Sequence, residues 1–361
     1  MNNSTDAFSF FNEEFYTRIG ATKLSDFLYI YLLTPLCVSG ILLNILSVII
    51  LFKIKIEQTK LYKYLIMYSL NSILFCFVCL FIFIPNSPRF FQHFTSLFAR
   101  VYKCVILTCI TSVLLSIGNF LDIIIGIDRL AIFDKKFNFV TKYSLFRIFC
   151  IIFVLSILVN FPVYFSYYVK SDEQFLSDAK LKKLSFRYCG RTEFFKSSYG
   201  SIFTMLHLLL RDWLTLICEI ITSYLSISNY RKFLAMTRRI NPNRTEMNII
   251  SVGVIGSGLN IDYDKNKKWK RKNEKGRQLL LMTIILSGMS IVSHVIISVV
   301  TVFSLNATYS LLLHSLNICY FVLVLKHNLN FFVFFCFNTN FRRLIRFNNI
   351  FASVDDKSNN T

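Results

Sequence analysis

Charged residues are scarce in this sequence, where they make up 17% of 361 positions. Glycine and proline are scarce as well, with 11 and 5 residues, which excludes collagen-like chains and disordered chains rich in these residues. Apolar residues supply 54% of the chain, and phenylalanine alone fills 39 positions. A water-soluble protein with a polar surface cannot bury so many apolar residues. The composition therefore excludes a water-soluble enzyme and a disulfide-rich secreted protein.

Seven apolar windows are long enough to cross a bilayer as helices. They lie at about 27–52, 64–84, 104–127, 148–169, 201–228, 279–304 and 309–337. We therefore expect an all-α membrane protein with a seven-transmembrane helix bundle over residues 27–337. We expect residues 1–26 to form an extracellular N-tail, 231–277 to form a long cytoplasmic loop, and 338–361 to form an amphipathic helix and a cytoplasmic tail.

The basic residues decide the orientation, because cytoplasmic connections carry an excess of Lys and Arg. With the N-terminus outside, the inner connections carry 26 of these residues and the outer connections carry 12. We therefore expect an outside N-terminus and an inside C-terminus in the plasma membrane. The net charge of +20 then belongs to a basic inner face against the lipid bilayer, and no nucleic-acid partner is expected. Residues 1–26 lack the apolar core of a cleavable signal peptide.

Sequons and cysteines agree with this orientation. The glycosylation sequons at Asn2, Asn3 and Asn306 all fall on the outer side. Eight of the ten cysteines lie in or at the ends of apolar windows, where a small apolar packing residue is the expected role. Cys104 and Cys189 remain, both in the oxidising compartment, so we expect a disulfide that ties the loop after the fourth span to the third span.

Several motifs lie in register along the chain. The third window ends on Asp128-Arg129-Leu130, and Cys104 lies 25 residues before Arg129. The seventh window ends on the run Asn330-Phe-Phe-Val-Phe334, and the first window contains Gly40 and Asn44. Together these residues resemble the rhodopsin-like (class A) family of G-protein-coupled receptors, in a divergent form similar to invertebrate orphan or peptide-receptor-like members. The resemblance covers residues 27 to about 351.

The resemblance implies a receptor and no enzyme or cofactor. It would bind an extracellular ligand, by preference a neuropeptide, in the outer half of the bundle and activate heterotrimeric G proteins at the inner face. Asp128 would hold Arg129 at rest and release it when the sixth span moves outward, with Asn330 and Phe334 in the same switch. Phe341, followed by two arginines, matches the family's short amphipathic helix on the inner membrane surface.

The sequence also departs from the family pattern. Leu130 replaces a tyrosine, phenylalanines replace the proline and tyrosine of the last motif, and Ser72 stands where the family usually has an aspartate. The tryptophan of the fourth span is missing, and so are the prolines of the fifth, sixth and seventh spans, with Thr215 near the first of these places. Because such prolines help helices to bend, these losses bear on the activation movement rather than on the fold.

Charged side chains inside membrane spans are costly and are hypotheses for functional sites. The candidates are Asp122, Arg211, Asp212, Glu219 and Lys326. Lys326 lies close to the depth where relatives hold a sodium ion, so its ammonium could replace the ion and pair with Asp122. The alternative is that Lys326 reaches a water cavity or backbone carbonyls. The intramembrane polar set is therefore Asn44, Ser72, Asp122 and Lys326.

The outer half of the bundle contains the candidate ligand site, with Thr111, His207, Arg211, His294 and Tyr320. Adjacent helical residues diverge by about 100°, so Arg211 could face the cavity while Asp212 faces a neighbouring helix. Arg211 would then bind a ligand carboxylate or amide, or else form an interhelical structural pair. The loop at 170–199 has seven basic and four acidic residues, which favours a peptide with acidic or amidated polar ends.

Amine ligands and retinal lack their usual binding residues at the corresponding positions of this sequence. Amine receptors carry an aspartate 18 residues before the motif arginine, where this chain has Thr111. Counting back from Asn330, the position of the opsin lysine is Val324, so retinal is not expected.

Other function classes remain as alternatives. A chemosensory receptor of the same fold fits the sequence equally. A secondary transporter or ion channel would use the buried charges as an ion path, but the sequence has no internal repeat and no pair of broken spans. An intramembrane hydrolase lacks an HExxH motif and paired aspartates at matching depth.

Overall fold

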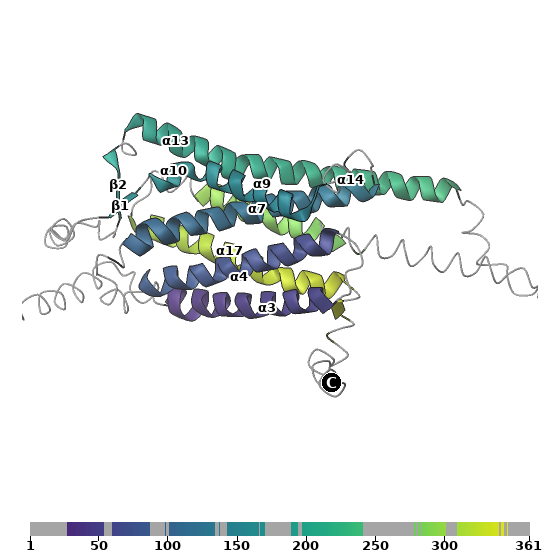
Figure 1. Ribbon diagram of the computed structural model, residues 1–361, viewed down its shortest axis with the longest axis horizontal. Helices are drawn as coiled ribbons and strands as arrows, with labels where there is room; N and C mark the ends of the chain where they lie inside the picture. Colours follow the sequence, from purple (N-terminus) through teal and green to yellow (C-terminus); the bar gives the residue numbers. More distant parts are fainter. Residues whose placement is uncertain are drawn as a thin grey trace, which may run out of the picture.

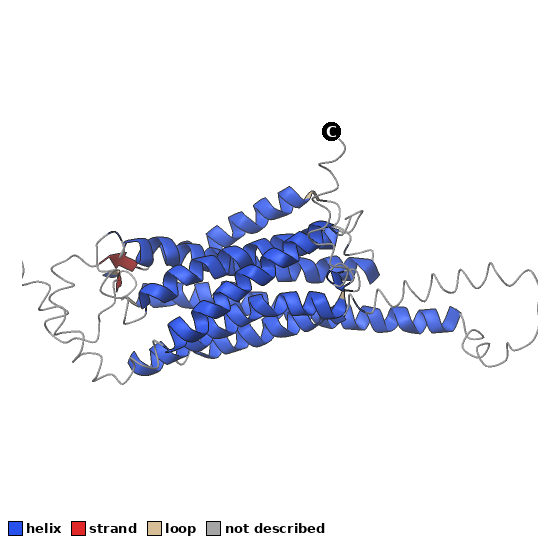
Figure 2. Ribbon diagram, turned by 90° about the horizontal axis from the view of Figure 1, so that it is seen from below, coloured by secondary structure: helices blue, strands red, loops and turns tan. Residues whose placement is uncertain are grey.

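The computed structural model describes most of the seven windows and their flanks. The described residues are 27–53, 60–86, 101–133, 143–165, 167–169, 189–193, 197–240, 284–300 and 309–338, with short pieces at 98, 137, 278, 281–282, 341–342 and 345. The described residues form seven helical runs that lie side by side in one elongated bundle (Figures 1 and 2). The fold is therefore the expected all-α membrane bundle.

The seven runs contain π-helical as well as α-helical stretches. In chain order they are η1 (Phe27–Leu33) with α3 (Thr34–Lys53), α4 (Lys60–Asn86), η3 (Tyr102–Leu107) with α7 (Thr108–Phe133), α9 (Leu145–Val159) with α10 (Phe161–Tyr164), α13 (Ser198–Leu208) with η5 (Leu209–Trp213) and α14 (Leu214–Ile240), the helix Ile284–Val300, and α17 (Tyr309–Phe337). Four have the length and apolarity to cross a membrane, namely Phe27–Lys53, Leu61–Phe81, Val105–Ala131 and Ile318–Phe337. Leu145–Val159 and Ile284–Val300 are shorter apolar helices.

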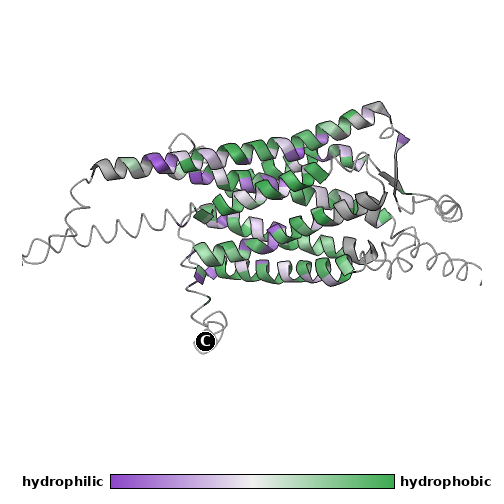
Figure 3. Cartoon of the chain, turned by 180° about the vertical axis from the view of Figure 1, so that it is seen from behind, coloured by the Kyte–Doolittle hydropathy of each residue, from purple (hydrophilic) through white to green (hydrophobic). Residues whose placement is uncertain are grey.

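Hydrophobic residues predominate along the helices of the bundle (Figure 3). Large hydrophobic side chains on different helices point outward, among them Leu42, Phe77, Phe146 and Leu158. Soluble proteins rarely expose contiguous apolar surface on this scale. The chain is therefore a multi-pass membrane protein, with these side chains in contact with lipid.

The interior has two apolar clusters with polar residues between them. One cluster includes Tyr68, Leu286 and Phe331, and the other includes Phe75, Ile297 and Val324. Ser72, Ser290 and the run Lys326 to Asn328 are buried between members of the two clusters along α4, the helix Ile284–Val300 and α17. A polar layer therefore crosses the middle of the bundle.

Two connections differ from the sequence-based boundaries. The fourth window, expected at about 148–169, breaks at Asn160, and Pro162 lies in the first turn of α10. Residues Tyr167–Val169 form strand β1, which pairs antiparallel with β2 (Cys189–Arg191). In the fifth run, α14 continues to Ile240, so the first ten residues of the expected loop at 231–277 are helical.

Close packing of three helices at Gly40 gives a testable prediction. A Cβ atom there would lie 2.8 Å from Cys76 Sγ and 3.0 Å from Asn328 Nδ2. Both distances are too short, so Gly40→Ala should lower the free energy of unfolding by about 1–3 kcal/mol through overpacking. At Gly288 a Cβ atom would meet no described atom within 4 Å.

Gly288→Ala is therefore the matched control, and it should be neutral or should stabilise its helix by roughly 0.5–1 kcal/mol. Thermal denaturation of both purified variants tests the pair. Equal melting temperatures for the two variants would contradict the close approach at Gly40.

Candidate functional site

One turn of α17 carries three consecutive polar residues, Lys326, His327 and Asn328, and all three are buried. Successive residues on an α-helix point about 100° apart, so each reaches a different neighbour. Lys326 reaches α7 and the helix Ile284–Val300, His327 reaches α4, and Asn328 reaches the first helical run. This turn therefore connects α17 to most of the bundle.

His327 bonds to Ser72, the residue at the family's usual aspartate position. Ser72 Oγ donates to Tyr68 O at 2.9 Å and lies 2.8 Å from His327 Nδ1. Because a serine hydroxyl has one hydrogen, His327 must donate from Nδ1 to Ser72. The imidazole ring also packs against Phe75, with centroids 4.6 Å apart.

Asn328 and Asn44 connect α17 to the first run. Asn328 Nδ2 donates to Leu36 O at 2.9 Å, and Ser39 Oγ donates to Asn328 Oδ1 at 2.9 Å. Asn44 Nδ2 donates to Gly40 O at 2.8 Å and to His327 O at 3.1 Å. Ser72 and Asn44 therefore belong to this side of the polar layer and not to the surroundings of Lys326.

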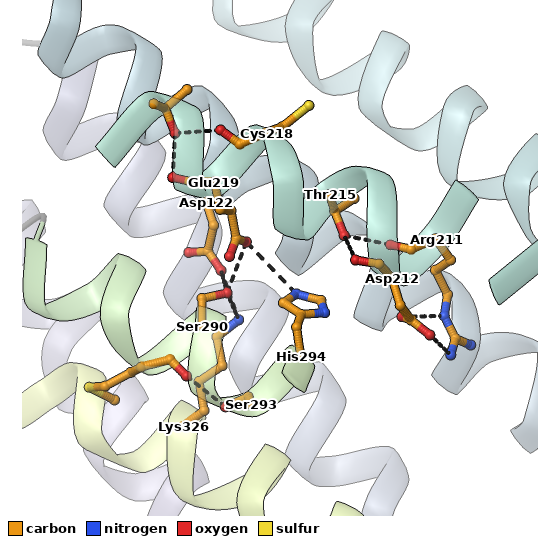
Figure 4. A network of polar contacts seen from close by, with 12 residues as sticks. Asp122, Arg211, Asp212, Thr215, Cys218, Glu219, Ser290, Ser293, His294 and Lys326 are labelled. Carbon is orange, nitrogen blue, oxygen red and sulfur yellow. Dashed lines mark hydrogen bonds and ion pairs between the residues drawn. The ribbon is translucent and has the colours of Figure 1, made fainter. Parts of the chain in front are cut away.

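Lys326 and Asp122 form a buried ion pair (Figure 4). Lys326 Nζ lies 2.8 Å from Asp122 Oδ2, and the side chains are only 5% and 8% exposed. The ammonium also donates to Ser290 Oγ at 2.8 Å. The structure thus contains the pairing that the sequence left as one of two alternatives.

Glu219 extends this pair into a network of four helices. Ser290 Oγ lies 2.9 Å from Glu219 Oε1 and 3.2 Å from Asp122 Oδ2. His294 Nε2 lies 3.8 Å from Glu219 Oε1. The network therefore joins α7, α14, the helix Ile284–Val300 and α17 through one serine (Figure 4). Ser290 carried no charge signal in the sequence, and its role was missed.

Arg211 and Asp212 do not diverge, so the expectation that they face different partners is wrong. Arg211 Nε donates to Asp212 Oδ1 at 2.9 Å, and Arg211 Nη2 lies 2.7 Å from Asp212 Oδ2. The long arginine side chain curls back along the helix to form this bidentate pair. Its guanidinium is already occupied by its own neighbour.

The pair lies in the π-helical turn η5. Thr215 Oγ1 makes hydrogen bonds to Arg211 O at 2.6 Å and to Asp212 O at 3.0 Å. A π-turn disturbs the regular helical ladder, and the single hydroxyl hydrogen of Thr215 is shared between these two carbonyls or donated to one of them. The fifth run therefore has a π-turn just before Thr215, near the place of the proline that the sequence comparison found missing.

His207 lies in a second polar chain. Its Nε2 is 3.1 Å from Asn160 Oδ1, while Asn160 Nδ2 donates to Ser116 Oγ at 2.7 Å. This chain connects α13, the break between α9 and α10, and α7. Neither Asn160 nor Ser116 was singled out in the sequence, because single uncharged polar residues are common in membrane helices.

Three of the five expected ligand-site residues gather around Asp212. Arg211 bonds to it, and His207 and His294 lie near enough to interact with it electrostatically. Thr111 donates its hydroxyl to Leu107 O in its own helical run at 2.6 Å. Tyr320 packs against the apolar cluster that contains Val324.

The expected switch residues lie where α7 and α17 end. Arg129 is buried at 2% exposure, and its Nε and Nη2 atoms have no hydrogen-bond partner among the described residues. Asp128, the preceding residue, is buried beside it and attracts it. Asn330 is buried in α17. Among the described residues, two of the donor atoms of this buried guanidinium are therefore without an acceptor.

An aromatic cluster and a cap fix the chain after α17. Phe341 packs edge-on against Phe331 and Phe334, with centroids 5.7 and 6.1 Å away. Asn338 Oδ1 accepts from Phe341 N at 3.1 Å, and Asn338 O accepts from Arg342 N at 3.0 Å. Phe341 and Arg342 are helical, and Arg343 lies outside the described residues. The phenylalanines of the altered motif therefore anchor the start of the next helix.

Several predicted positions lie outside the described residues or side chains. They are the sequon residues Asn2, Asn3 and Asn306 and the side chains of Cys104 and Cys189. The two cysteines stand in η3 and β2, and β1, the partner of β2, contacts η3. The Cys104–Cys189 disulfide stays a prediction.

Comparisons with known proteins show which solved fold this bundle is similar to. No protein-family model matches the sequence, and no curated protein matches it. The structure is similar to the crystal structure of squid rhodopsin, with a TM-score of 0.64 and 13% sequence identity, over 91% of this chain and 85% of that one. The chain has the rhodopsin fold. In this rhodopsin-like bundle, the network around Lys326 and the buried Arg129 are the two candidate functional centres.

Proposed function

We propose that this chain is a G-protein-coupled receptor that binds an extracellular ligand and activates a heterotrimeric G protein. The observation that carries the proposal is Arg129, a buried guanidinium at the inner end of α7 in a rhodopsin-like bundle. Its neighbour is Asp128, as the family motif requires. This arrangement supports signalling through protein contact rather than catalysis.

The physical basis is the cost of a buried charge. A buried donor without a partner costs free energy, and Arg129 has two such donor atoms among the described residues. When the inner end of the bundle opens, carbonyl or carboxylate groups of a G-protein α subunit can accept these donors. The G protein would then favour the open state through differential affinity. Asp128 restrains Arg129 until that point.

The ligand end is proposed in the outer half of the bundle. Arg211 bonds to Asp212 there, and His207 and His294 interact with Asp212 electrostatically. A neuropeptide with an acidic or amidated end suits this mixture of imidazole, guanidinium and carboxylate. A Cys104–Cys189 disulfide would hold the loop across the entrance.

The membrane orientation belongs to the same proposal. With 26 basic residues on one side and 12 on the other, the end that contains Arg129 faces the cytoplasm of the plasma membrane. The N-tail sequons Asn2 and Asn3 are then glycosylated outside. The basic inner face attracts anionic lipid headgroups as well as the G protein.

A transporter or channel is the weaker alternative. Lys326 pairs with Asp122 and Arg211 pairs with Asp212 at 2.7–2.8 Å, so four of the five candidate charges are neutralised in pairs and are not available to line an ion path. A chemosensory receptor of the same fold would use the same inner face with a different ligand.

The test is a ligand screen on the full-length chain. Cells that express it with chimeric G proteins are exposed to a neuropeptide library, and second messengers, membrane current and solute uptake are recorded. We expect at least one peptide to produce a G-protein response that mock-transfected cells lack. Responses to odorants alone would support a chemosensory receptor, and current or uptake without a G-protein response would contradict the proposal.

A further inference from the structure

The serine at the centre of the network has too few hydrogens for its neighbours. A serine hydroxyl has one hydrogen to donate and two lone pairs to accept with. Ser290 Oγ has three polar contacts, with Lys326 Nζ at 2.8 Å, Glu219 Oε1 at 2.9 Å and Asp122 Oδ2 at 3.2 Å. Lys326 can only donate, so one lone pair of Ser290 Oγ accepts its hydrogen bond. The single hydrogen serves one carboxyl, and the other carboxyl can bond only if it carries its own hydrogen.

The charges of the network lead to the same result. Asp122 and Glu219 bring two carboxyls, Lys326 brings one ammonium, and all three side chains are at most 8% exposed. Arg211 and Asp212 neutralise each other. With both carboxyls ionised, one negative charge would be buried without a counterion among the described groups, which is strongly unfavourable. A proton removes that charge.

The position of the proton follows from the ion pair. Asp122 is in direct contact with the Lys326 ammonium at 2.8 Å and is therefore the ionised carboxyl. The basic group nearest to Glu219 is His294, with Nε2 at 3.8 Å, and it is a cation only when protonated. Glu219 Oε2 has no hydrogen-bond partner among the described residues. We propose that Glu219 is a proton-binding site: its carboxyl donates to Ser290 Oγ, which donates to Asp122 Oδ2, which pairs with Lys326.

The titratable groups around Glu219 come from every side of the network. Asp122 faces it from α7, Lys326 from α17 and His294 from the helix Ile284–Val300, with Nε2 at 3.8 Å. Tyr68 of α4 stands beside Asp122, and the neutral pair of Arg211 and Asp212 stands beside His294. Of these groups, only Lys326 is a permanent cation near Glu219, and Asp122 already neutralises it.

This proton has a structural consequence. Its loss would leave two anionic carboxyls at one serine and would break the hydrogen bond between Glu219 and Ser290. That bond connects α14 to the helix Ile284–Val300, the fifth and sixth runs. The proton therefore stabilises the contact between these two helices, and release of the proton weakens it. The site does not depend on the ligand or G protein proposed above.

Infrared spectroscopy tests the site directly on the purified full-length protein in lipid nanodiscs. At neutral pH we expect the carbonyl band of a protonated carboxylic acid, shifted in deuterated water, and we expect Glu219→Gln to lack it. Ser290→Ala should keep the band but move it to the higher frequency of a carboxylic acid without that hydrogen bond. Glu193→Gln, at an exposed glutamate, is the matched control and should leave the band unchanged.

The pH dependence of stability provides a second test, because the proposal predicts its direction. The folded protein would hold this proton at neutral pH, whereas a glutamate in the unfolded chain loses it at about pH 4.3. Since the folded state binds more protons, stability must fall as pH rises above this value. Melting temperature should therefore fall more with pH in the wild type than in Glu219→Gln. A wild type without the band, a band that survives in Glu219→Gln, or equal pH slopes in the two proteins would overturn the proposal.

Discussion

Replacing Lys326 with methionine is expected to destabilise the protein by about 3–5 kcal/mol, because it leaves the Asp122 carboxylate buried without its counterion. The ion pair at 2.8 Å is 5% and 8% exposed, so solvent cannot compensate for the loss. The ammonium also donates to Ser290, and that bond is lost with it. Thermal denaturation of the purified variant measures the effect.

Two further variants make this result specific. Lys63→Met makes the same chemical change at an exposed lysine and should alter stability by no more than about 0.5 kcal/mol. Adding Asp122→Asn to Lys326→Met removes the orphaned charge and should restore most of the loss. If the double variant is no more stable than Lys326→Met alone, the charge pairing is not what holds these helices.

Replacing Arg129 with alanine is expected to abolish most signalling while the protein still reaches the cell surface. Truncating one partner of a buried, hydrogen-bonded charge typically costs about 2 kcal/mol or more, which is at least about 30-fold in affinity for the G protein. Nucleotide exchange by a purified G protein, with the receptor variant in nanodiscs, measures this loss. Cell-surface level and melting temperature are measured for the same variant, because Arg129 is a large buried side chain beside Asp128 and its removal also lowers stability.

Charge alone does not explain the expected loss, and a matched variant tests that point. Arg147→Ala removes an exposed basic residue near the start of α9 and should leave nucleotide exchange close to wild type. Asp128→Asn should raise ligand-independent exchange, because Asp128 is the proposed restraint on Arg129. Equal losses in the Arg129 and Arg147 variants would assign the effect to general surface charge instead.

The sequence predicted the fold well because membrane insertion imposes a simple pattern. A membrane span needs a long apolar stretch, and such a stretch can be identified in the sequence without knowing how the helices pack. Where a boundary depended on local backbone detail, prediction failed. Pro162 ended the α9 helix before the apolar window ended, and α14 continued through polar residues to Ile240. Hydropathy does not report either effect.

The candidate site was predictable only in part. A charged residue inside a membrane span is rare because its burial is energetically unfavourable, so Asp122, Glu219 and Lys326 were identified as candidates from the sequence. Ser290 was not found, because an uncharged hydroxyl on a membrane helix usually bonds to its own backbone. Three consecutive polar residues from Lys326 to Asn328 were the available signal for a connecting turn, since their directions on a helix reach different neighbours.

Arg211 and Asp212 show the limit of helical geometry as a guide. The angle between adjacent Cα–Cβ bonds predicts divergence, but a long guanidinium side chain can fold back to its neighbour and make two hydrogen bonds. The π-turn that holds the pair has no sequence signature comparable to a proline. Such a pair is visible only once the backbone is known.

The location of the two chain ends tests the account most directly. Epitope tags at the N-terminus and C-terminus are stained in intact cells and again after permeabilisation. We predict that the N-terminal tag is labelled in intact cells and that the C-terminal tag is labelled only after permeabilisation. Labelling of both tags under the same condition would contradict an odd number of spans and, with it, a receptor whose Arg129 faces the cytoplasm.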